Sequence, residues 1–398
     1  MKRTLRLTAG LLALLILAGC SAVGSQPDQT PQPTPSSAVE STPQPEPTPE
    51  PTPEPTSEPT PEPTPEPTPE PTPEPTPQIE YELYYGQVPH IFTHCLIAYP
   101  ELKDGSGKMR YDPDCINVTE FKNLLNELYA NGYSLVDIHD IYQEDENGVL
   151  TMKEAVEVPK GRKPVVFSID DVVYDYDKRG NGMVDLLALD EQGNLVSGTY
   201  LPDGTVDYSY DRDVFPILEA FIAEHPDFSS HGARVTLCMT GFAGVFGYRT
   251  EEGDWQGDRQ AEIEKATAVA NRLKELGYTF ASHSYGHYNH EKHSVSSLRD
   301  DLQAFQDEVV PIIGEVSVYV YPYGKLLYPS DERYKVMQEY GFDLFCSVSH
   351  FFFSRDYESG DTLYMTRVAI DGYSLRNYQT VLSPLFDTEK VIDHANRP

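Results

Sequence analysis

TFASHSYGH (residues 279–287) and VVFSIDD (residues 165–171) are the two stretches that decide the fold. In each, a short apolar run ends in side chains that can bind a metal ion: two histidines four residues apart in the first, two adjacent aspartates in the second. Both runs have the length and composition of buried strands. In α/β proteins, sites assemble at the carboxyl ends of strands, so we expect these four side chains to meet at one edge of a sheet.

The four residues Asp170, Asp171, His283 and His287 have the composition of a catalytic metal site. Imidazoles four residues apart project on the same side of a helical turn or a tight loop, so both can reach one ion. A catalytic ion keeps three protein ligands and one position for water, and a nearby carboxylate can take that water's proton. We therefore expect one aspartate to bind metal and the other to act as a base. A lone HxxxH pattern more often binds nothing, and the strand-ending order of the two motifs is what supports the site.

Three motifs carry a resemblance to a known family. SIDD (168–171), SHSYGH (282–287) and YPYG (321–324) resemble the TFDDG, HSxxH and PYG motifs of the polysaccharide deacetylase family, the NodB-homology domain or carbohydrate esterase family 4. VPHIFTHCLIA (88–98) resembles the opening of one branch of this family, and MTRVAI (365–370) resembles its late LPRI strand. The resemblance covers about residues 90 to 385 and implies a metal-dependent deacetylase.

The resemblance also implies roles for individual residues. Asp170 stands at the position of the family's catalytic base, and Asp171, His283 and His287 stand at the positions of its metal ligands. Tyr323 lies where the family's oxyanion-hole residue donates its backbone N–H. Zinc suits an Asp-His-His set, although cobalt, nickel or manganese could occupy it.

Two further site residues follow from the resemblance: one from the branch of the family, and one from a family residue that this sequence lacks. The branch that opens in this way is circularly permuted and takes its catalytic acid from the first strand, which makes His94 the expected acid and His350 the alternative. The family's Arg before PYG, which orients the base, is replaced by Tyr319, and Arg367 on the late strand is the candidate substitute. Val172 stands where the family has Gly, so the turn after the aspartates must accept a β-branched side chain.

Three functions remain open from the sequence. The first is removal of N-acetyl groups from a GlcNAc-containing cell-wall or surface polysaccharide. The second is O-acetyl ester hydrolysis on xylan or another glycan by the same site. The third is glycan binding by a wall-anchored protein that has lost catalysis. Peptidoglycan, poly-N-acetylglucosamine and chitin oligomers all remain candidate substrates.

The N-terminus predicts a bacterial lipoprotein. Lys2, Arg3 and Arg6 precede the apolar run 11–17 and the small residues before Cys20, the pattern of a signal peptide that ends at a lipidated cysteine. We expect a signal peptide at residues 1–19 and a lipid on Cys20. The lipid would anchor the protein to the outer face of the cytoplasmic membrane without spanning it.

Residues 20–79 predict a disordered tether that reaches into the cell wall. From about Gln26 to Gln78 the chain is mostly Pro, Thr and Glu, with a Pro-Glu-Pro-Thr repeat of period four. Proline at every second position forbids helix and sheet and favours polyproline II, so the tether could extend on the order of 150 Å. The deacetylase domain would then occupy residues 80–398.

The charge of the chain limits its partners. The net charge is −33, and residues 80–398 carry 53 acidic and 27 basic residues, a net charge of −26. This charge disfavours nucleic acid or anionic lipid as the ligand and is compatible with a neutral or partly cationic glycan. The resemblance implies an acetylated polysaccharide as the partner, and no protein partner is evident.

The rest of the sequence predicts one α/β domain. Three segments share the order amphipathic helix, glycine, aromatic and strand, at Gly132-Tyr133, Gly277-Tyr278 and Gly341-Phe342, which favours parallel strands wrapped by helices. The resemblance specifies a single distorted (β/α) barrel of about seven strands. Turn signals within residues 183–210 predict a β-hairpin insertion over the active-site mouth.

The sequence also gives expectations for the cysteines and for one further histidine. Cys238 and Cys346 lie in apolar runs and should be buried free thiols, whereas Cys95 and Cys115 could pair outside the cell. His290, close after the HxxxH motif, is expected to be solvated.

Overall fold

The computed structural model describes residues 79–253, 255–356 and 360–397. The predicted signal peptide, Cys20 and nearly all of the tether lie outside the described residues. Within those ranges, no helix combines the length and the apolar character that crossing a membrane would need.

Seven parallel strands close into a barrel. Their order is β11, β12, β13, β14, β16, β2 and β7, and β7 pairs back with β11. A short eighth strand, β3 (Tyr133–Leu135), pairs with residues 163–165 of β7, ahead of the stretch 168–170 that pairs with β11. The predicted distorted barrel of about seven strands is therefore confirmed. The barrel strands are β2 (His90–His94), β7 (Lys163–Asp170), β11 (Thr236–Met239), β12 (Thr279–Ser282), β13 (Val318–Val320), β14 (Leu344–Val348) and β16 (Leu363–Ala369).

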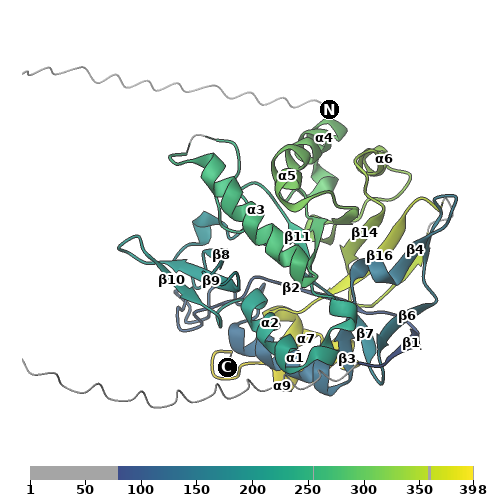
Figure 1. Ribbon diagram of the computed structural model, residues 1–398, viewed down its shortest axis with the longest axis horizontal. Helices are drawn as coiled ribbons and strands as arrows, with labels where there is room; N and C mark the ends of the chain where they lie inside the picture. Colours follow the sequence, from purple (N-terminus) through teal and green to yellow (C-terminus); the bar gives the residue numbers. More distant parts are fainter. Residues whose placement is uncertain (1–78, 254, 357–359, 398) are drawn as a thin grey trace, which may run out of the picture. The chain divides into compact units, whose positions relative to one another are not determined.

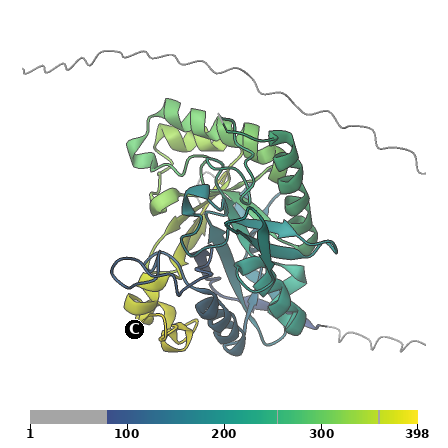
Figure 2. The ribbon, with the colours of Figure 1, turned by 90° about the vertical axis from the view of Figure 1, so that its left-hand side faces the viewer.

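Helices surround the barrel (Figures 1 and 2). Three of them end at the predicted glycines: Gly132 after α1 has φ +80°, Gly277 after α3 has φ +100° and Gly341 after α6 has φ +88°, a left-handed conformation that costs glycine little. A Cβ at Gly277 would also lie 2.2 Å from the Gly232 carbonyl oxygen, so the close turn into β12 requires glycine. The helices are α1 (Val118–Ala130), α2 (Val214–Glu224), α3 (Arg259–Leu276), α4 (Val295–Ala304), α5 (Val310–Ile313), α6 (Glu332–Glu339), α7 (Gly372–Asn377), α8 (Gln379–Leu382) and α9 (Thr388–Val391).

Alternation along β7 divides the core in two. Val165, Phe167 and Ile169 belong to the large apolar cluster that also includes the buried stripe of α1. Val166 belongs to a second cluster, which also contains Cys238 and Cys346 from β11 and β14. Because successive side chains of a strand point to opposite faces, Ser168 and Asp170 lie on the same face of β7 as Val166. The barrel interior therefore becomes polar toward the carboxyl end of β7.

The predicted insertion differs from the expectation. It is a three-stranded antiparallel sheet, β8 (Leu186–Leu189), β9 (Leu195–Tyr200) and β10 (Val206–Ser209), instead of one hairpin. β8 contacts α3 and β9 contacts α2, and of residues 183–210 only Met183 lines the cavity described below. The apolar face of this sheet has to be buried, and the helices provide the cover, so the sheet does not lie over the mouth.

Short strands complete the described part of the chain. β1 (Tyr81–Tyr85) pairs with β6 (Ala155–Pro159), and β4 (Tyr142–Glu144) pairs with β5 (Leu150–Met152). β15 (Ser354–Asp356) pairs antiparallel with β16.

Candidate active site

A cavity of about 530 Å³ lies at the carboxyl ends of the barrel strands. His94 and Asp170, the last residues of β2 and β7, are direct neighbours in the register of these two strands. The cavity brings together all seven residues that the sequence predicted for the site: His94, Asp170, Asp171, His283, His287, Tyr323 and Arg367.

Asp170 forms a buried two-point ion pair with Arg367. The Arg367 Nη1 and Nη2 atoms lie 2.6 and 2.9 Å from the two carboxylate oxygens, and the exposed fractions are 0% for Arg367 and 2% for Asp170. Burial alone would raise the pKa of Asp170, but the guanidinium of Arg367 and the nearby His283 hold that pKa well below its usual range. Asp170 is therefore a fixed carboxylate at neutral pH.

Asp171, His283 and His287 place three ligand atoms within 4.8 Å of one another. The Nδ1–H of His283 donates to the Val320 carbonyl at 2.9 Å, which leaves Nε2 as the free lone pair. Burial lowers the pKa of His283, so the ring is neutral, as a ligand must be. The buried Oδ1 of Asp171 has no hydrogen-bond partner and lies 3.8 Å from His287 Nε2. An anionic oxygen without a donor, beside two imidazoles, fits a divalent cation.

The loop between the two histidines is held by Asp301 of α4. This buried carboxylate accepts hydrogen bonds from the Ser284 hydroxyl at 3.1 Å, the Tyr285 N–H at 3.0 Å and the Gly286 N–H at 2.7 Å. His287 itself has φ +53°, an uncommon conformation for a non-glycine residue that the surrounding contacts have to maintain. Asp301 thus fixes the turn that presents both histidines.

His94 faces the two aspartates from β2. Its Nδ1–H donates to the Asp114 carbonyl at 2.9 Å, so Nε2 is the ring nitrogen left for a ligand or a substrate. Tyr323 has φ +58° and a 63% exposed side chain, and its ring centroid lies 4.6 Å from that of His287. His94 and Tyr323 both line the cavity that contains the proposed ligands.

Comparison with known families gives a match over part of the barrel. Residues 229–345 match the family model described as polysaccharide deacetylase. This segment is similar to the polysaccharide deacetylase family. The matched segment includes His283, His287 and Tyr323, whereas the other site residues lie outside it on β2, β16 and the end of β7.

Solved structures with a similar arrangement include further deacetylases. The Streptococcus pyogenes deacetylase PplD, in complex with acetate, is 13% identical with a TM-score of 0.44, covering 76% of this chain and 99% of its own. A polysaccharide deacetylase from Bacillus cereus is 13% identical with a TM-score of 0.43, covering 75% and 69%. The BpsB deacetylase domain from Bordetella bronchiseptica is 14% identical with a TM-score of 0.36, covering 72% and 96%. None of the curated proteins compared with the chain matches it significantly.

The site also contains buried polar residues that sequence reasoning missed. The Ser168 hydroxyl lies 3.0 Å from Arg367 Nη1 and 2.9 Å from His90 Nε2, so a chain of contacts runs from His90 to Asp170. Ser168 could have been found, because it lies two residues before Asp170 and therefore on the same strand face. His90 carries the same signal, because it lies four residues before His94 on β2 and therefore on the same face. The buried Asp301 has no such signal, because nothing in its local sequence marks it as a partner of the histidine loop.

Two residues that depart from the family pattern have clear surroundings. Val172 is fully buried, and the residue in the left-handed region is Asp171 with φ +56°, so the β-branched side chain avoids that conformation. Tyr319, in place of the family's Arg, donates or accepts a 2.7 Å hydrogen bond with His290 Nε2. The expectation that His290 is solvated was wrong: it is 1% exposed, because Tyr319 gives it a buried partner.

The remaining candidates separate by position. His350 is exposed and makes an edge-to-face contact with Tyr378, with ring centroids 4.4 Å apart, and it is not among the residues that line the cavity. Cys95 and Cys115 line the cavity as free thiols, and burial raises the pKa of Cys115 to about 12. Cys238 and Cys346 are buried free thiols, as predicted.

Proposed function

We propose that this protein is a metal-dependent hydrolase that removes N-acetyl groups from a GlcNAc-containing polysaccharide. Polysaccharide deacetylation is the activity that the family supports. The observation that carries the proposal is the juxtaposition of three clustered ligand atoms, one of them a buried carboxylate oxygen without a hydrogen-bond partner, with a second carboxylate fixed by a buried arginine.

Asp171, His283 and His287 would hold one divalent ion, with zinc the best fit to this donor set and cobalt, nickel or manganese as alternatives. Such an ion would supply Lewis-acid polarisation of the acetyl carbonyl. The chain's own contribution is to keep the His283 imidazole neutral and oriented and to leave the Asp171 Oδ1 without a competing donor.

Asp170 would act as the base. Its carboxylate accepts a proton from the attacking water while Arg367 keeps it ionised and fixed in orientation. The backbone N–H of Tyr323 would donate to the oxyanion that develops on the acetyl oxygen. His94, oriented by the Asp114 carbonyl, would pass a proton from Nε2 to the leaving amine nitrogen. The products are acetate and a free amino sugar.

The proposed location comes from the sequence. Lipid on Cys20 would anchor the protein to the outer face of the bacterial cytoplasmic membrane, and the Pro-rich tether would let the domain reach polysaccharide in the cell wall.

Acetate release tests this proposal and identifies the substrate. The protein should release acetate from at least one of peptidoglycan, poly-N-acetylglucosamine and chitin oligomers, with Asp170→Asn as the inactive control. Release from acetylated xylan alone would assign the protein as an O-acetyl esterase. Binding to these glycans without acetate release from any of them would assign it as a glycan-binding protein.

A further inference from the structure

Arg397 occupies a fully enclosed position next to the loop that orients His94. Its side chain is 0% exposed, and its guanidinium makes five hydrogen bonds with donor–acceptor distances between 2.5 and 3.0 Å. A guanidinium carries five N–H donors, so each donor has an acceptor. Two of the acceptors are the carboxylate oxygens of Glu120, which is itself buried.

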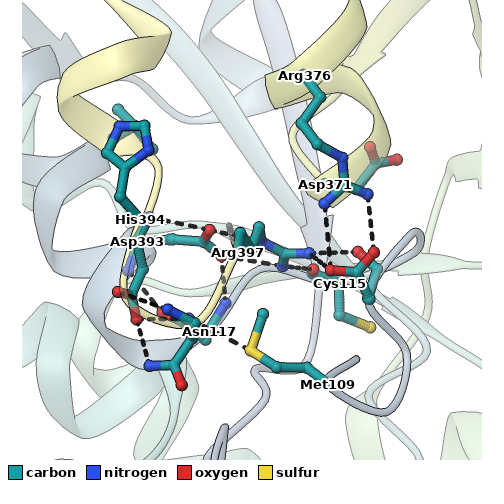
Figure 3. Close-up of polar contacts among 12 residues, drawn as sticks. Met109, Cys115, Asn117, Asp371, Arg376, Asp393, His394 and Arg397 are labelled. Carbon is teal, nitrogen blue, oxygen red and sulfur yellow. Dashed lines mark hydrogen bonds and ion pairs between the residues drawn. The ribbon is translucent and has the colours of Figure 1, made fainter. Parts of the chain in front are cut away.

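The other acceptors lie on the loop 112–115. Arg397 donates to the carbonyls of Asp112 and Cys115 and to the carboxylate of Asp112. Figure 3 shows Arg397 between Asn117 and Cys115, with Arg376 reaching the same group of contacts from α7. The guanidinium therefore forms hydrogen bonds with the backbone on both sides of Asp114.

Asp114 is the residue whose carbonyl accepts the Nδ1–H of His94. The carbonyls of the whole segment are engaged: those of residues 112 and 115 by Arg397, that of Pro113 by the Tyr373 N–H at 3.0 Å, and that of Asp114 by His94. A rigid acceptor at this point fixes both the tautomer and the ring plane of His94.

The segment 393–397 is also held by hydrogen bonds that do not involve the loop 112–115. Asp393 accepts from the Asn117 side chain at 3.0 Å, and the Asp393 N–H donates to Glu120 at 3.2 Å (Figure 3). Gly372, at the start of α7, completes the enclosure, since a Cβ there would lie 1.9 Å from the Asp112 carbonyl oxygen and 2.1 Å from Arg397 Nη1.

We propose that Arg397 is a positioning residue for leaving-group protonation: it holds the Asp112–Cys115 backbone so that the Asp114 carbonyl orients His94. This inference rests on the proposed function, because it takes His94 as the acid. A purely structural arginine would affect all substrates alike. A residue that acts through His94 should affect amides more than activated esters, because an amine leaving group needs a proton and a good alcohol leaving group needs it less.

The test compares kcat/KM on an N-acetylglucosamine oligomer with kcat/KM on an activated acetate ester. We expect Arg397→Lys and Gly372→Ala each to lower the amide value on the order of 10-fold, with much smaller loss on the ester and unchanged metal content. Gly372→Ala keeps the arginine at position 397 but forces its guanidinium and the Asp112 carbonyl to shift, so it tests these contacts without removing a buried charge. Arg376→Met is the matched control, because Arg376 contacts the Asp112 carboxylate but neither backbone carbonyl, and it should leave the ratio unchanged.

His94→Ala distinguishes failure of the Arg397 proposal from failure of the assignment of His94 as the acid. One result would overturn the positioning role: His94→Ala shifts the amide-to-ester ratio of kcat/KM, while Arg397→Lys and Gly372→Ala lower kcat/KM equally on both substrates or on neither. The proposed function stands in that case. An equal shift in Arg376→Met would also overturn the positioning role. If His94→Ala causes no shift, the assignment of the acid in the proposed function fails first, and the role of Arg397 fails with it.

Discussion

Replacing Arg367 with Met should destabilise the protein strongly at neutral pH and much less at acidic pH. The substitution removes two charge-assisted hydrogen bonds, of 2.6 and 2.9 Å, and leaves a 2% exposed carboxylate without a cation. Removing one partner of a buried ion pair costs about 3–5 kcal/mol. For a domain of this size the expected fall in Tm is roughly 10 °C.

The sign of the pH dependence follows from the pKa of Asp170. Arg367 holds that pKa below the unfolded value of about 3.9, so the pair contributes its full stability above that value and loses it as the pH falls toward the folded pKa. In Arg367→Met, burial instead raises the pKa of Asp170, so the carboxyl takes up a proton in mild acid and the penalty shrinks. The acidic limb of kcat/KM should therefore move to higher pH in the variant.

Urea unfolding of the wild type and Arg367→Met at pH 7 and pH 4 measures this effect. Arg299→Met is the control, because its ion pair with Glu339 is solvent-exposed and its loss should leave the midpoint unchanged. The expectation is contradicted if Arg367→Met loses no more unfolding free energy than Arg299→Met. It is also contradicted if the loss in Arg367→Met is as large at pH 4 as at pH 7.

Three further predictions concern other parts of the protein. His94→Ala should keep its metal and lose more activity on amides than on activated esters, whereas His350→Ala should leave the ratio of the two activities unchanged; the reverse result would move the acid to His350. Asp301→Asn should lower metal affinity by about 10- to 100-fold in a titration, because an amide cannot accept all three hydrogen bonds of the histidine loop, while the exposed neighbour Asp300→Asn should bind metal normally. Deleting residues 43–77 should leave hydrolysis of soluble oligomers intact and reduce action on intact cell walls; slower hydrolysis of the soluble substrates would show that the tether is more than a spacer.

The barrel was predictable because its strands and helix ends carry strong local signals. The alternation in VVFSIDD and the glycines after α1 and α3 indicate strands that re-enter the core, and the structure confirms them. The insertion was predictable as β-structure. The position of its sheet was not, because an alternating pattern does not say which helices bury the apolar face of the sheet.

The candidate site was predictable where residues lie in short motifs and unpredictable where partners are distant. Asp171, His283 and His287 stand out in two motifs, and Arg367 could be named because the late strand resembles that of the family. Asp301 and Arg397 act through hydrogen bonds to residues that their own sequence neighbourhood does not indicate; Arg397 lies 282 positions from Cys115, whose carbonyl it binds. Such pairs become visible only when the chain is folded.

Zinc titration of the wild type and His283→Ala, with acetate release from an N-acetylglucosamine oligomer measured on the same samples, tests whether Asp171, His283 and His287 form a catalytic metal site. We expect close to one zinc ion per wild-type chain, acetate release that disappears on chelation and returns with zinc, and neither tight binding nor turnover in His283→Ala. Equal zinc binding by the two proteins, or full acetate release by His283→Ala, would contradict it.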